Sequence, residues 1–183
     1  MKKLFFQHPK ALVDKGAKIG AGTRVWAFAH VQPGAQIGCD CNIGEQCYIE
    51  RGAVVGDRST IKNGVAVWDG VTIENDVFVG PYATFTNDLY PRSKKKDWRL
   101  EKTKVGHGAT IGANATILAG ISIGSYALIA AGALVTKSVP PHALVLGNPG
   151  KVVGRVCFCG HVLKRKGKAQ ACPNCKPPHH FGR

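Results

Sequence analysis

Branched aliphatic residues recur at every sixth position over most of the chain. Val or Ile occupies every sixth position from Val13 to Val79 and again from Val105 to Val135, which makes eighteen positions in all. The residue four places after each of these anchor positions is small or apolar, and the residue directly after an anchor is often Gly. An amphipathic helix needs a period of 3.6 and a two-sided strand a period of 2, so neither explains the pattern.

The period of six predicts an all-β fold, a parallel β-helix shaped as a triangular prism. Each hexapeptide supplies one short strand and one corner, and three hexapeptides make one coil. The branched anchors suit a pleated surface and are expected to point inward, each stacked on its counterpart one coil away. Glycine and small residues suit tight corners. Residues 13–84 give four coils and residues 105–140 two more, so we expect about six coils.

The register fails over residues 85–104, a segment with Pro91 and seven basic residues. This segment cannot continue the prism and is expected to protrude as a loop from one corner. Insertions in repeat proteins tend to lie on the binding face, whereas the plainer alternative is a solvated, charge-rich loop without a role. Residues 142–156 are expected to close the last coil as a short helix or strand, which completes a β-helix domain of residues 1–156.

Residues 157–183 form a cysteine-rich tail with the spacing C-x-C, a twelve-residue gap, and C-x-x-C. Four thiolates can bind one tetrahedral Zn²⁺, so we expect a small zinc-ribbon-like appendage with a structural zinc ion. Free thiols in a flexible tail are the alternative, and His161 and His179 are alternative ligands. The expected ligands are Cys157, Cys159, Cys172 and Cys175.

The chain carries a formal net charge of +14 and has a pI near 9.7, which favours anionic partners such as nucleic acid, a membrane surface or phosphorylated small molecules. The apolar stretch at the N-terminus ends after Leu4, Phe5 and Phe6, whereas a secretory signal needs about 7–15 apolar residues. No stretch approaches the roughly 18 apolar residues of a membrane span. We therefore expect a cytoplasmic protein with no membrane partner, and an odd number of cysteines without a disulfide framework.

Several motifs within and around the interruption are more specific than the repeat itself. They are Val25-Trp26-Ala27-Phe28-Ala29-His30, Trp68-Asp69-Gly70-Val71-Thr72-Ile73-Glu74, Val77-Phe78-Val79-Gly80-Pro81, Phe85-Thr86-Asn87-Asp88, Pro91-Arg92-Ser93 and Gly147-Asn148-Pro149. With these motifs the chain resembles the hexapeptide-repeat acyltransferases, and more narrowly the nucleotide-sugar 3-N-acetyltransferases that act on dTDP- or UDP-linked 3-amino sugars. The resemblance spans residues 8–155.

This resemblance implies a left-handed winding and a homotrimer with acetyl-CoA in the groove between adjacent prisms. It also implies that the nucleotide sugar is held near the protruding loop. The C3 amine of the sugar would attack the thioester carbonyl directly, without an acyl-enzyme. Trimerisation agrees with the flat faces of a prism, which offer extended surfaces for symmetric packing.

Amide formation needs an uncharged amine, alignment with the thioester and donors for the developing oxyanion. Asn87 is the first catalytic candidate, because a neutral amide can hold the sugar or its amine without a charge cost; a turn residue is the alternative. His107 is the second, because imidazole can accept a proton near neutral pH, with a solvent- or subunit-facing histidine as the alternative. His30 is a weaker candidate, several coils from the loop. Assistance by the leaving thiolate is an alternative to an enzymic base.

Residues for substrate and cofactor are predicted from their positions. Asp88 could accept a hydrogen bond from a sugar hydroxyl or cap the turn, and the planar fork of Arg92 suits a diphosphate. Small side chains late in the repeat would let pantetheine approach closely, and basic residues there could meet the CoA phosphates. The substrate candidates are Trp68, Asp69, Asp88 and Arg92, and the acetyl-CoA candidates are Ala113, Ala131, Lys137 and Arg155.

Three other functions are alternatives to sugar N-acetylation. The same prism could acylate a different amino or hydroxyl acceptor. A γ-class carbonic anhydrase shares the prism but needs three zinc-binding histidines, and His30 and His107 do not have the required spacing. A nucleic-acid-binding module would fit the net charge, since basic residues concentrate in the loop and the tail, but we do not expect nucleic acid as the partner.

Overall fold

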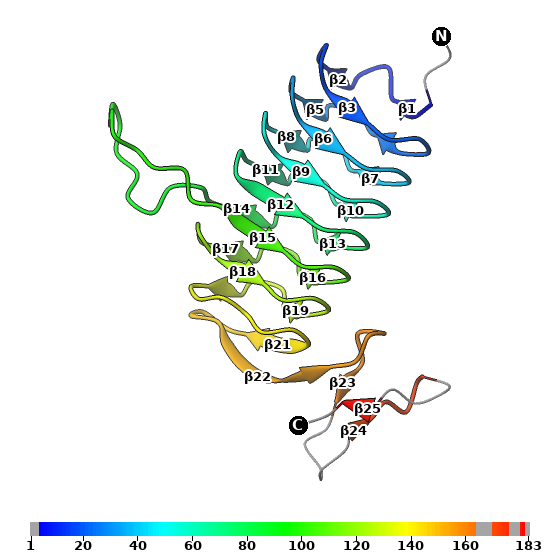
Figure 1. Ribbon diagram of the computed structural model, residues 1–183, viewed down its shortest axis with the longest axis vertical. Helices are drawn as coiled ribbons and strands as arrows, with labels where there is room; N and C mark the ends of the chain where they lie inside the picture. The colour runs from blue at the N-terminus through cyan, green and yellow to red at the C-terminus, as the bar shows by residue number, and fades with distance from the viewer. Residues whose placement is uncertain (1–3, 164–169, 176–179, 182–183) are drawn as a thin grey trace.

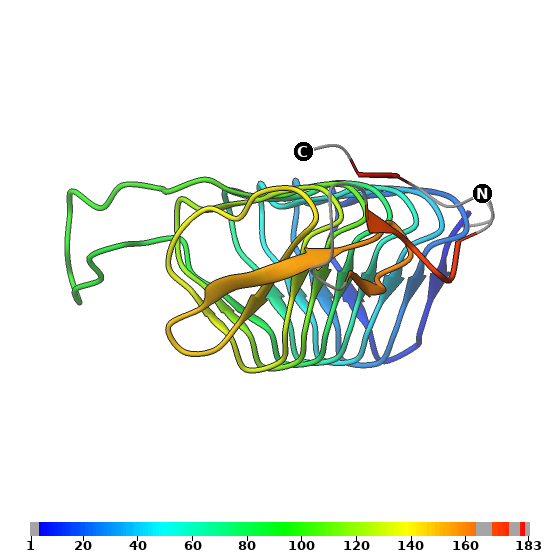
Figure 2. The ribbon, with the colours of Figure 1, turned by 90° about the horizontal axis from the view of Figure 1, so that it is seen from below.

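The computed structural model describes residues 4–163, 170–175 and 180–181. Short strands wind around a prism with three sheets as its faces, seen from the side in Figure 1 and along the prism in Figure 2; the strands of successive coils pair in parallel. Among the described residues there is no helix, and so none of the length and apolarity that a membrane crossing requires. The prediction of an all-β parallel β-helix is confirmed.

Each face of the prism is one sheet, named here sheet A, B or C. Sheet A contains, in spatial order, β1 (Phe6–Gln7), β4 (Arg24–Val25), β7 (Asn42–Ile43), β10 (Thr60–Ile61), β13 (Phe78–Val79), β16 (Thr110–Ile111), β19 (Leu128–Ile129), β21 (Ala143–Leu146), β22 (Lys151–Val156) and β23 (Val162–Leu163). Sheet B contains β2 (Leu12–Val13), β5 (His30–Val31), β8 (Tyr48–Ile49), β11 (Ala66–Val67), β14 (Thr84–Phe85), β17 (Thr116–Ile117) and β20 (Leu134–Val135). Sheet C contains β3 (Lys18–Ile19), β6 (Gln36–Ile37), β9 (Val54–Val55), β12 (Val71–Ile73), β15 (Thr103–Val105) and β18 (Ser122–Ile123). A separate two-stranded sheet pairs β24 (Gln170–Ala171) with β25 (His180–Phe181).

The anchors build the core through a register of one coil. Ile43 pairs with Val25 on one side and with Ile61 on the other, and all three side chains are fully buried. Every buried anchor therefore stacks on the anchors directly above and below it, which is why the period of six must persist along the chain. Small residues four places later, such as Ala53 and Ala109, fill the corners and are equally buried.

The coils are more numerous than predicted. The seven strands of sheet B mark seven coils, and β21 begins an eighth by pairing parallel to β19. The prediction of about six missed β1, which precedes Val13, and treated Phe85 as part of the interruption. Phe85 is 1% exposed and pairs with Ile117, so an aromatic side chain fills an anchor position and the coil continues through it.

The protruding loop leaves the prism between β14 and β15, so it comprises residues 86–102 rather than 85–104. Figure 2 shows it extending outward from one corner of the prism. At the other end, β21 closes the last coil and turns into the antiparallel β22, which confirms the strand rather than the helix for residues 142–156. The strand β23 then pairs antiparallel with β22, next to the cysteine-rich tail.

Candidate active site

The predicted site residues lie on three different corners of the prism. We name the corners by the sheets they join: corner BC carries Trp68, Asp69 and the protruding loop, and corner CA carries His107. Corner AB carries Ala113 and Ala131. The geometry at each corner decides which of these residues act together within one chain.

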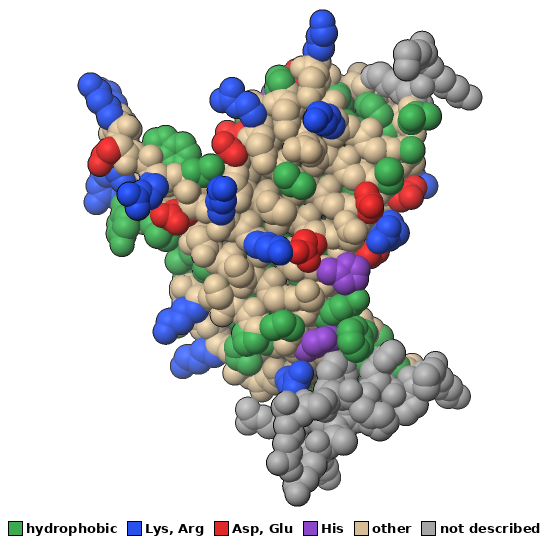
Figure 3. All heavy atoms as spheres, in the orientation of Figure 1, with side chains coloured by type: hydrophobic (Ala, Val, Ile, Leu, Met, Phe, Trp, Pro, Cys, Tyr) green, Lys and Arg blue, Asp and Glu red, His purple; other side chains and the backbone are tan. Residues whose placement is uncertain are grey.

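The protruding loop forms a basic cavity at its base. Asn87, Asp88 and Arg92 line a hollow of about 260 Å³ together with Lys95 and Trp98. Three predicted residues are therefore brought together, and Lys95 and Trp98 were missed because nothing in an irregular loop indicates which side chains fold back. In Figure 3 lysine and arginine side chains cluster on this loop. A cationic, aromatic-edged hollow suits a phosphorylated ligand with a flat ring.

Asn87 sits where the loop leaves the prism. Its backbone carbonyl accepts a hydrogen bond from the Glu101 amide at 3.2 Å, which joins the two stems of the loop. Its side-chain Nδ2 lies 3.5 Å from the carbonyl oxygen of Asp69, at the long limit of a hydrogen bond. The amide is half-buried, so it is held in place yet has capacity to contact a ligand in the hollow.

Trp68 and Asp69 support the loop from the preceding coil. The indole Nε1 of Trp68 donates to the Phe85 carbonyl at 2.9 Å, and its ring packs against the core and Tyr48. The backbone amide of Asp69 donates to Glu50 at 2.8 Å. The polar atom of Trp68 is thus engaged in holding the last residue before the loop.

Asp88 and Arg92 make local contacts within the loop. The carboxylate of Asp88 accepts a hydrogen bond from the Tyr90 amide at 2.8 Å, which is the turn-capping role that the sequence left open. Arg92 is exposed and donates to the carbonyl of its neighbour Pro91 at 2.9 Å, so most of its donors face the hollow and solvent.

His107 is surrounded by charged groups at corner CA. Its backbone amide donates to Glu74 at 2.8 Å, and its Nδ1 lies 3.5 Å from the carboxylate of Asp76. A bidentate pair with Arg58, at 2.8 Å for both bonds, holds Asp76 and lowers the pKa of its carboxyl. The hydrogen bond from Lys104, followed by that from the His107 amide, lowers the pKa of Glu74. Two ionised carboxylates therefore flank this imidazole, at the edge of a hollow of about 300 Å³.

The lowered pKa of Glu74 gives a pH-dependent stability that can be measured. Its ordinary value is 4.5, and its pKa is lower in the folded chain, so its contribution is present above pH 4.5 and is lost as the pH falls through the folded pKa. We expect Glu74→Gln to unfold more easily than the natural chain at pH 7 and the difference to shrink towards pH 3. Denaturant unfolding across this range measures it, and a difference independent of pH would contradict the assignment.

The remaining candidates are dispersed. His30 lies on β5, where its Nε2 is 2.8 Å from Asp14, several coils before the loop. Ala113 and Ala131 are successive corner AB residues, with the Gly132 amide donating to the Ala113 carbonyl at 2.8 Å. Lys137 is exposed on corner BC after β20, and Arg155 is exposed on β22 opposite Ala143.

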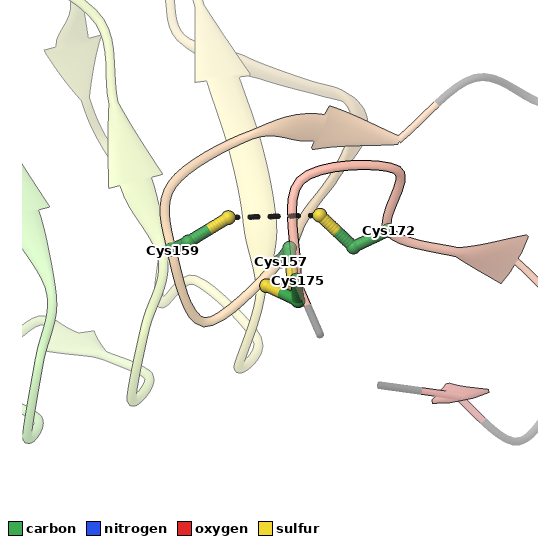
Figure 4. Close-up of side chains that lie close together, drawn as sticks. All are labelled: Cys157, Cys159, Cys172 and Cys175. Carbon is green, nitrogen blue, oxygen red and sulfur yellow. Dashed lines mark hydrogen bonds between the residues drawn. The ribbon is translucent and has the colours of Figure 1, made fainter. Parts of the chain in front are cut away.

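The four tail cysteines converge, as the sequence predicts. Their sulfur atoms all lie within 4.8 Å of one another (Figure 4), with Cys157 and Cys175 3.6 Å apart and Cys159 and Cys172 also 3.6 Å apart. This is the only cluster in the described ranges whose His, Cys, Asp or Glu side chains could hold a metal ion, so no histidine cluster of the carbonic anhydrase kind occurs there within one chain.

Of the two alternative ligands, His161 lies outside this cluster. The Nδ1 atom of His161 forms a 3.0 Å hydrogen bond with the Asn174 side chain, and His179 lies outside the described residues. Desolvation acts to raise the pKa of the Cys172 thiol, but the backbone amide of Asn174 and the neighbouring sulfurs outweigh it and lower the pKa to about 7. The Cys159 sulfur, followed by desolvation, raises the pKa of Cys175 to about 12, so the negative charge of the cluster is centred on Cys172. A thiolate is the form that binds a metal.

Comparison with known proteins shows the class of protein to which this fold belongs. Residues 16–51 and 102–137 match the family model described as bacterial transferase hexapeptide (six repeats). The acetyltransferase domain of PglB from Neisseria gonorrhoeae, in complex with acetyl coenzyme A, superposes with a TM-score of 0.57 at 23% identity over 82% of this chain. PerB from Caulobacter crescentus, in complex with CoA and GDP-perosamine, gives 0.54 at 21% identity over 82% of this chain. The chain spans 58% of each of those two chains. The fold and repeats define a hexapeptide-repeat transferase.

A curated relative narrows the class. The dTDP-3-amino-3,6-dideoxy-alpha-D-galactopyranose 3-N-acetyltransferase of Aneurinibacillus thermoaerophilus is 51% identical over 159 residues, which cover 87% of this chain and 82% of the relative. An alignment of 159 residues is far longer than the 72 residues matched by the repeat model, so the similarity is not confined to those repeats. The chain belongs to the family of hexapeptide-repeat nucleotide-sugar 3-N-acetyltransferases, and it is an enzyme.

Proposed function

We propose that this protein transfers the acetyl group of acetyl-CoA to the C3 amine of a nucleotide-linked 3-amino-3,6-dideoxyhexose. The observation that carries the proposal is the 51% identity to an enzyme named for this reaction on a dTDP-linked sugar. The cationic hollow at the loop base supports it, because a diphosphate needs such groups. Since acetyl-CoA is a cytoplasmic metabolite, we also infer a cytoplasmic enzyme.

The reaction is a direct aminolysis of a thioester. The lone pair of the C3 nitrogen attacks the thioester carbonyl, the C–N bond forms, and the C–S bond then breaks to release CoA. The amine proton passes to a base, and we assign this role to His107, whose Nδ1 faces Asp76 and whose Nε2 is thereby left to face the amine. Asn87 would hold the amine or the sugar without adding charge, and Asp88 and Arg92 would bind a sugar hydroxyl and the diphosphate.

We propose that the site forms between subunits of a homotrimer. Asn87 lies on corner BC and His107 on corner CA, so sheet C separates them in one chain. The loop extends away from its own prism (Figure 2). A threefold arrangement lets the loop of one subunit meet corner CA of the next. Acetyl-CoA would lie in the groove between them.

The proposal is tested by thiol release from acetyl-CoA with a panel of dTDP- and UDP-linked amino sugars. We expect CoA release with 3-amino-3,6-dideoxyhexoses and little release with 2-amino or 4-amino sugars. Larger acyl-CoAs in the same assay define the acyl group. Absence of turnover on every 3-amino sugar would reject this function and leave the fold intact.

Replacing Asn87 by alanine is expected to lower turnover about 100-fold, the loss typical of removing a hydrogen-bonding group that acts in the transition state. Lys96→Ala in the same loop is the control, because Lys96 is exposed and does not line the hollow. Steady-state thiol release measures both variants. Wild-type activity in Asn87→Ala would remove Asn87 from the site.

Co-expression of two variants with strongly lowered turnover, Asn87→Ala and His107→Ala, tests whether the site is shared between subunits. Mixed oligomers of Asn87→Ala and His107→Ala chains contain interfaces where both natural residues meet, so activity should reappear on mixing. A site built within one chain predicts instead that mixed samples remain as inactive as each variant alone. The two chains carry different tags, so that mixed oligomers can be purified through both tags in turn. Thiol release by these mixed oligomers is then compared with that of each variant alone.

A further inference from the structure

The C-terminal cysteine cluster has a feature that the acetyl transfer does not explain: its sulfur atoms are arranged as metal ligands. A disulfide requires sulfurs about 2.05 Å apart, whereas the pairs here are separated by 3.6 Å. A tetrahedral Zn²⁺ site with Zn–S bonds of about 2.3 Å places its sulfurs roughly 3.8 Å apart. The two separations of 3.6 Å are close to this value, and the other sulfur pairs lie within 4.8 Å, so the four sulfurs are grouped around one point and neither close pair is a disulfide.

Two tight turns present these sulfurs. Cys157 and Cys159 flank a turn closed by a hydrogen bond from the Gly160 amide to the Cys157 carbonyl at 2.9 Å, where Gly160 has a φ of +81°. Cys172 and Cys175 come from a second turn after β24 (Figure 4). Two turns separated by twelve residues of the chain thus contribute two sulfurs each.

The apolar core around the cluster is too small to hold these segments together. In the part of the chain that the structure describes, it consists of Cys157, Leu163 and Cys172, with Cys175 packed against them. A unit with so few buried side chains needs a metal or covalent links to be stable. A metal bound by the four cysteines would supply the cohesion that the described part of this core lacks.

The residue between the first two cysteines contacts the β-helix. The ring of Phe158 lies 4.6 Å from that of Tyr126 and 4.6 Å from that of His142, edge to face in both contacts. Tyr126 in turn meets His107 edge to face at 5.1 Å. A continuous row of rings therefore connects the cysteine turn to the imidazole assigned as the base.

The same contacts enclose a cavity beside corner CA. Gly108, Thr110 and Tyr126 line one side of a hollow of about 180 Å³, and residues 156–160 of the first cysteine turn line the other. The cysteine turn therefore forms one wall of this hollow, whereas His107 lines a different hollow of the same corner.

We propose that Cys157, Cys159, Cys172 and Cys175 bind one structural Zn²⁺ that fixes Phe158 against Tyr126 and His142 and so supports the row of rings that ends at His107. The metal carries no reacting group, because all four ligand positions are taken by protein. Phe158 acts as a positioning residue through Tyr126. The zinc site stands on its own geometry, and its effect on turnover rests on the proposed acetyl transfer.

Metal analysis of the full-length chain, purified without added metal or chelator, tests the site. We expect about one zinc per chain, lost in Cys159→Ser and retained in Cys39→Ser. Cys159 and Cys39 are both exposed, so neither substitution leaves a hole in the core, and Cys39 lies far from the cluster in sequence and outside it. Replacement of the zinc by Co²⁺ should give the visible bands of tetrahedral thiolate coordination. Equal zinc contents in both variants, or iron in place of zinc, would overturn the assignment.

The link to corner CA is tested without relying on activity. In NMR spectra of histidine-labelled protein, the ring resonances of His107 and His142 should shift in Cys159→Ser and in Phe158→Ala, and stay in place in Cys39→Ser. Phe158→Ala should keep its zinc and, in the thiol-release assay, lower kcat with little change in the KM for acetyl-CoA. Unmoved resonances with zinc bound would reject the link; an inactive natural chain whose resonances do shift would reject only the acetyl transfer.

Discussion

The His107→Ala enzyme should retain its fold and its zinc but turn over about 100-fold more slowly at neutral pH, the lower range for loss of a general base. The imidazole has the surroundings that such a base needs, because Asp76 faces Nδ1 and is itself held by Arg58. The change should appear in kcat, and the KM for acetyl-CoA should stay close to that of the natural enzyme. Thiol release under single-turnover and steady-state conditions measures it.

The matched control is His30→Ala. His30 also faces a carboxylate, Asp14, at 2.8 Å and is partly exposed, but it lies on sheet B away from the loop. Its replacement should leave kcat close to the natural value. Equal losses in the two variants would show that the effect is general, and full activity in His107→Ala would assign proton removal to the leaving thiolate.

A single methyl group at Gly112 should destabilise the fold by about 3 kcal/mol, the upper range for inserting an atom into a packed core. A Cβ atom there would overlap the backbone nitrogen of Ala131 and lie 2.7 Å from the carbonyl carbon of Ala130. Both are backbone atoms of the next coil, so only a separation of the coils relieves the clash. Chemical denaturation of Gly112→Ala measures the loss.

Gly132→Ala is the control for this prediction. It lies on the same corner one coil later, has no atom within 4 Å of an added Cβ, and has a φ of +69°. Only the left-handed backbone opposes alanine there, at a cost of about 1 kcal/mol. A larger loss of unfolding free energy in Gly132→Ala than in Gly112→Ala would contradict the view that contact between coils limits which residues fit at the corners.

The sequence predicts the prism well because the residue type at each anchor position indicates whether that position is buried in the core. An inward-facing residue stacks on its counterparts one coil away within a single continuous core, so Val or Ile recurs wherever the coil continues. Phe85 shows the limit, since a phenylalanine in an anchor position looks like the start of the interruption until its pairing with Ile117 is seen. The extra strand β1 was missed for a similar reason, because Gln7 replaces the branched anchor.

The candidate site could be predicted only in part. The residues of one corner, Asn87, Asp88 and Arg92, meet because they share a loop, and the tail cysteines meet because metal-ligand spacing is strict. Sequence position does not reveal that Asn87 and His107 occupy different corners, because that depends on how the corners are distributed among three sheets. Lys95 and Trp98 follow no period, so only the folded loop shows that they face the hollow.

The reaction product tests the central claim most directly. Incubation of the natural chain with acetyl-CoA labelled with ¹³C at the carbonyl and a dTDP-linked 3-amino-3,6-dideoxyhexose should yield one labelled amide. Its carbonyl should couple in the NMR spectrum to the proton on the C3 nitrogen, and one CoA should be released for each amide. Label on a sugar hydroxyl, label on the protein, or recovery of unchanged sugar would contradict the account.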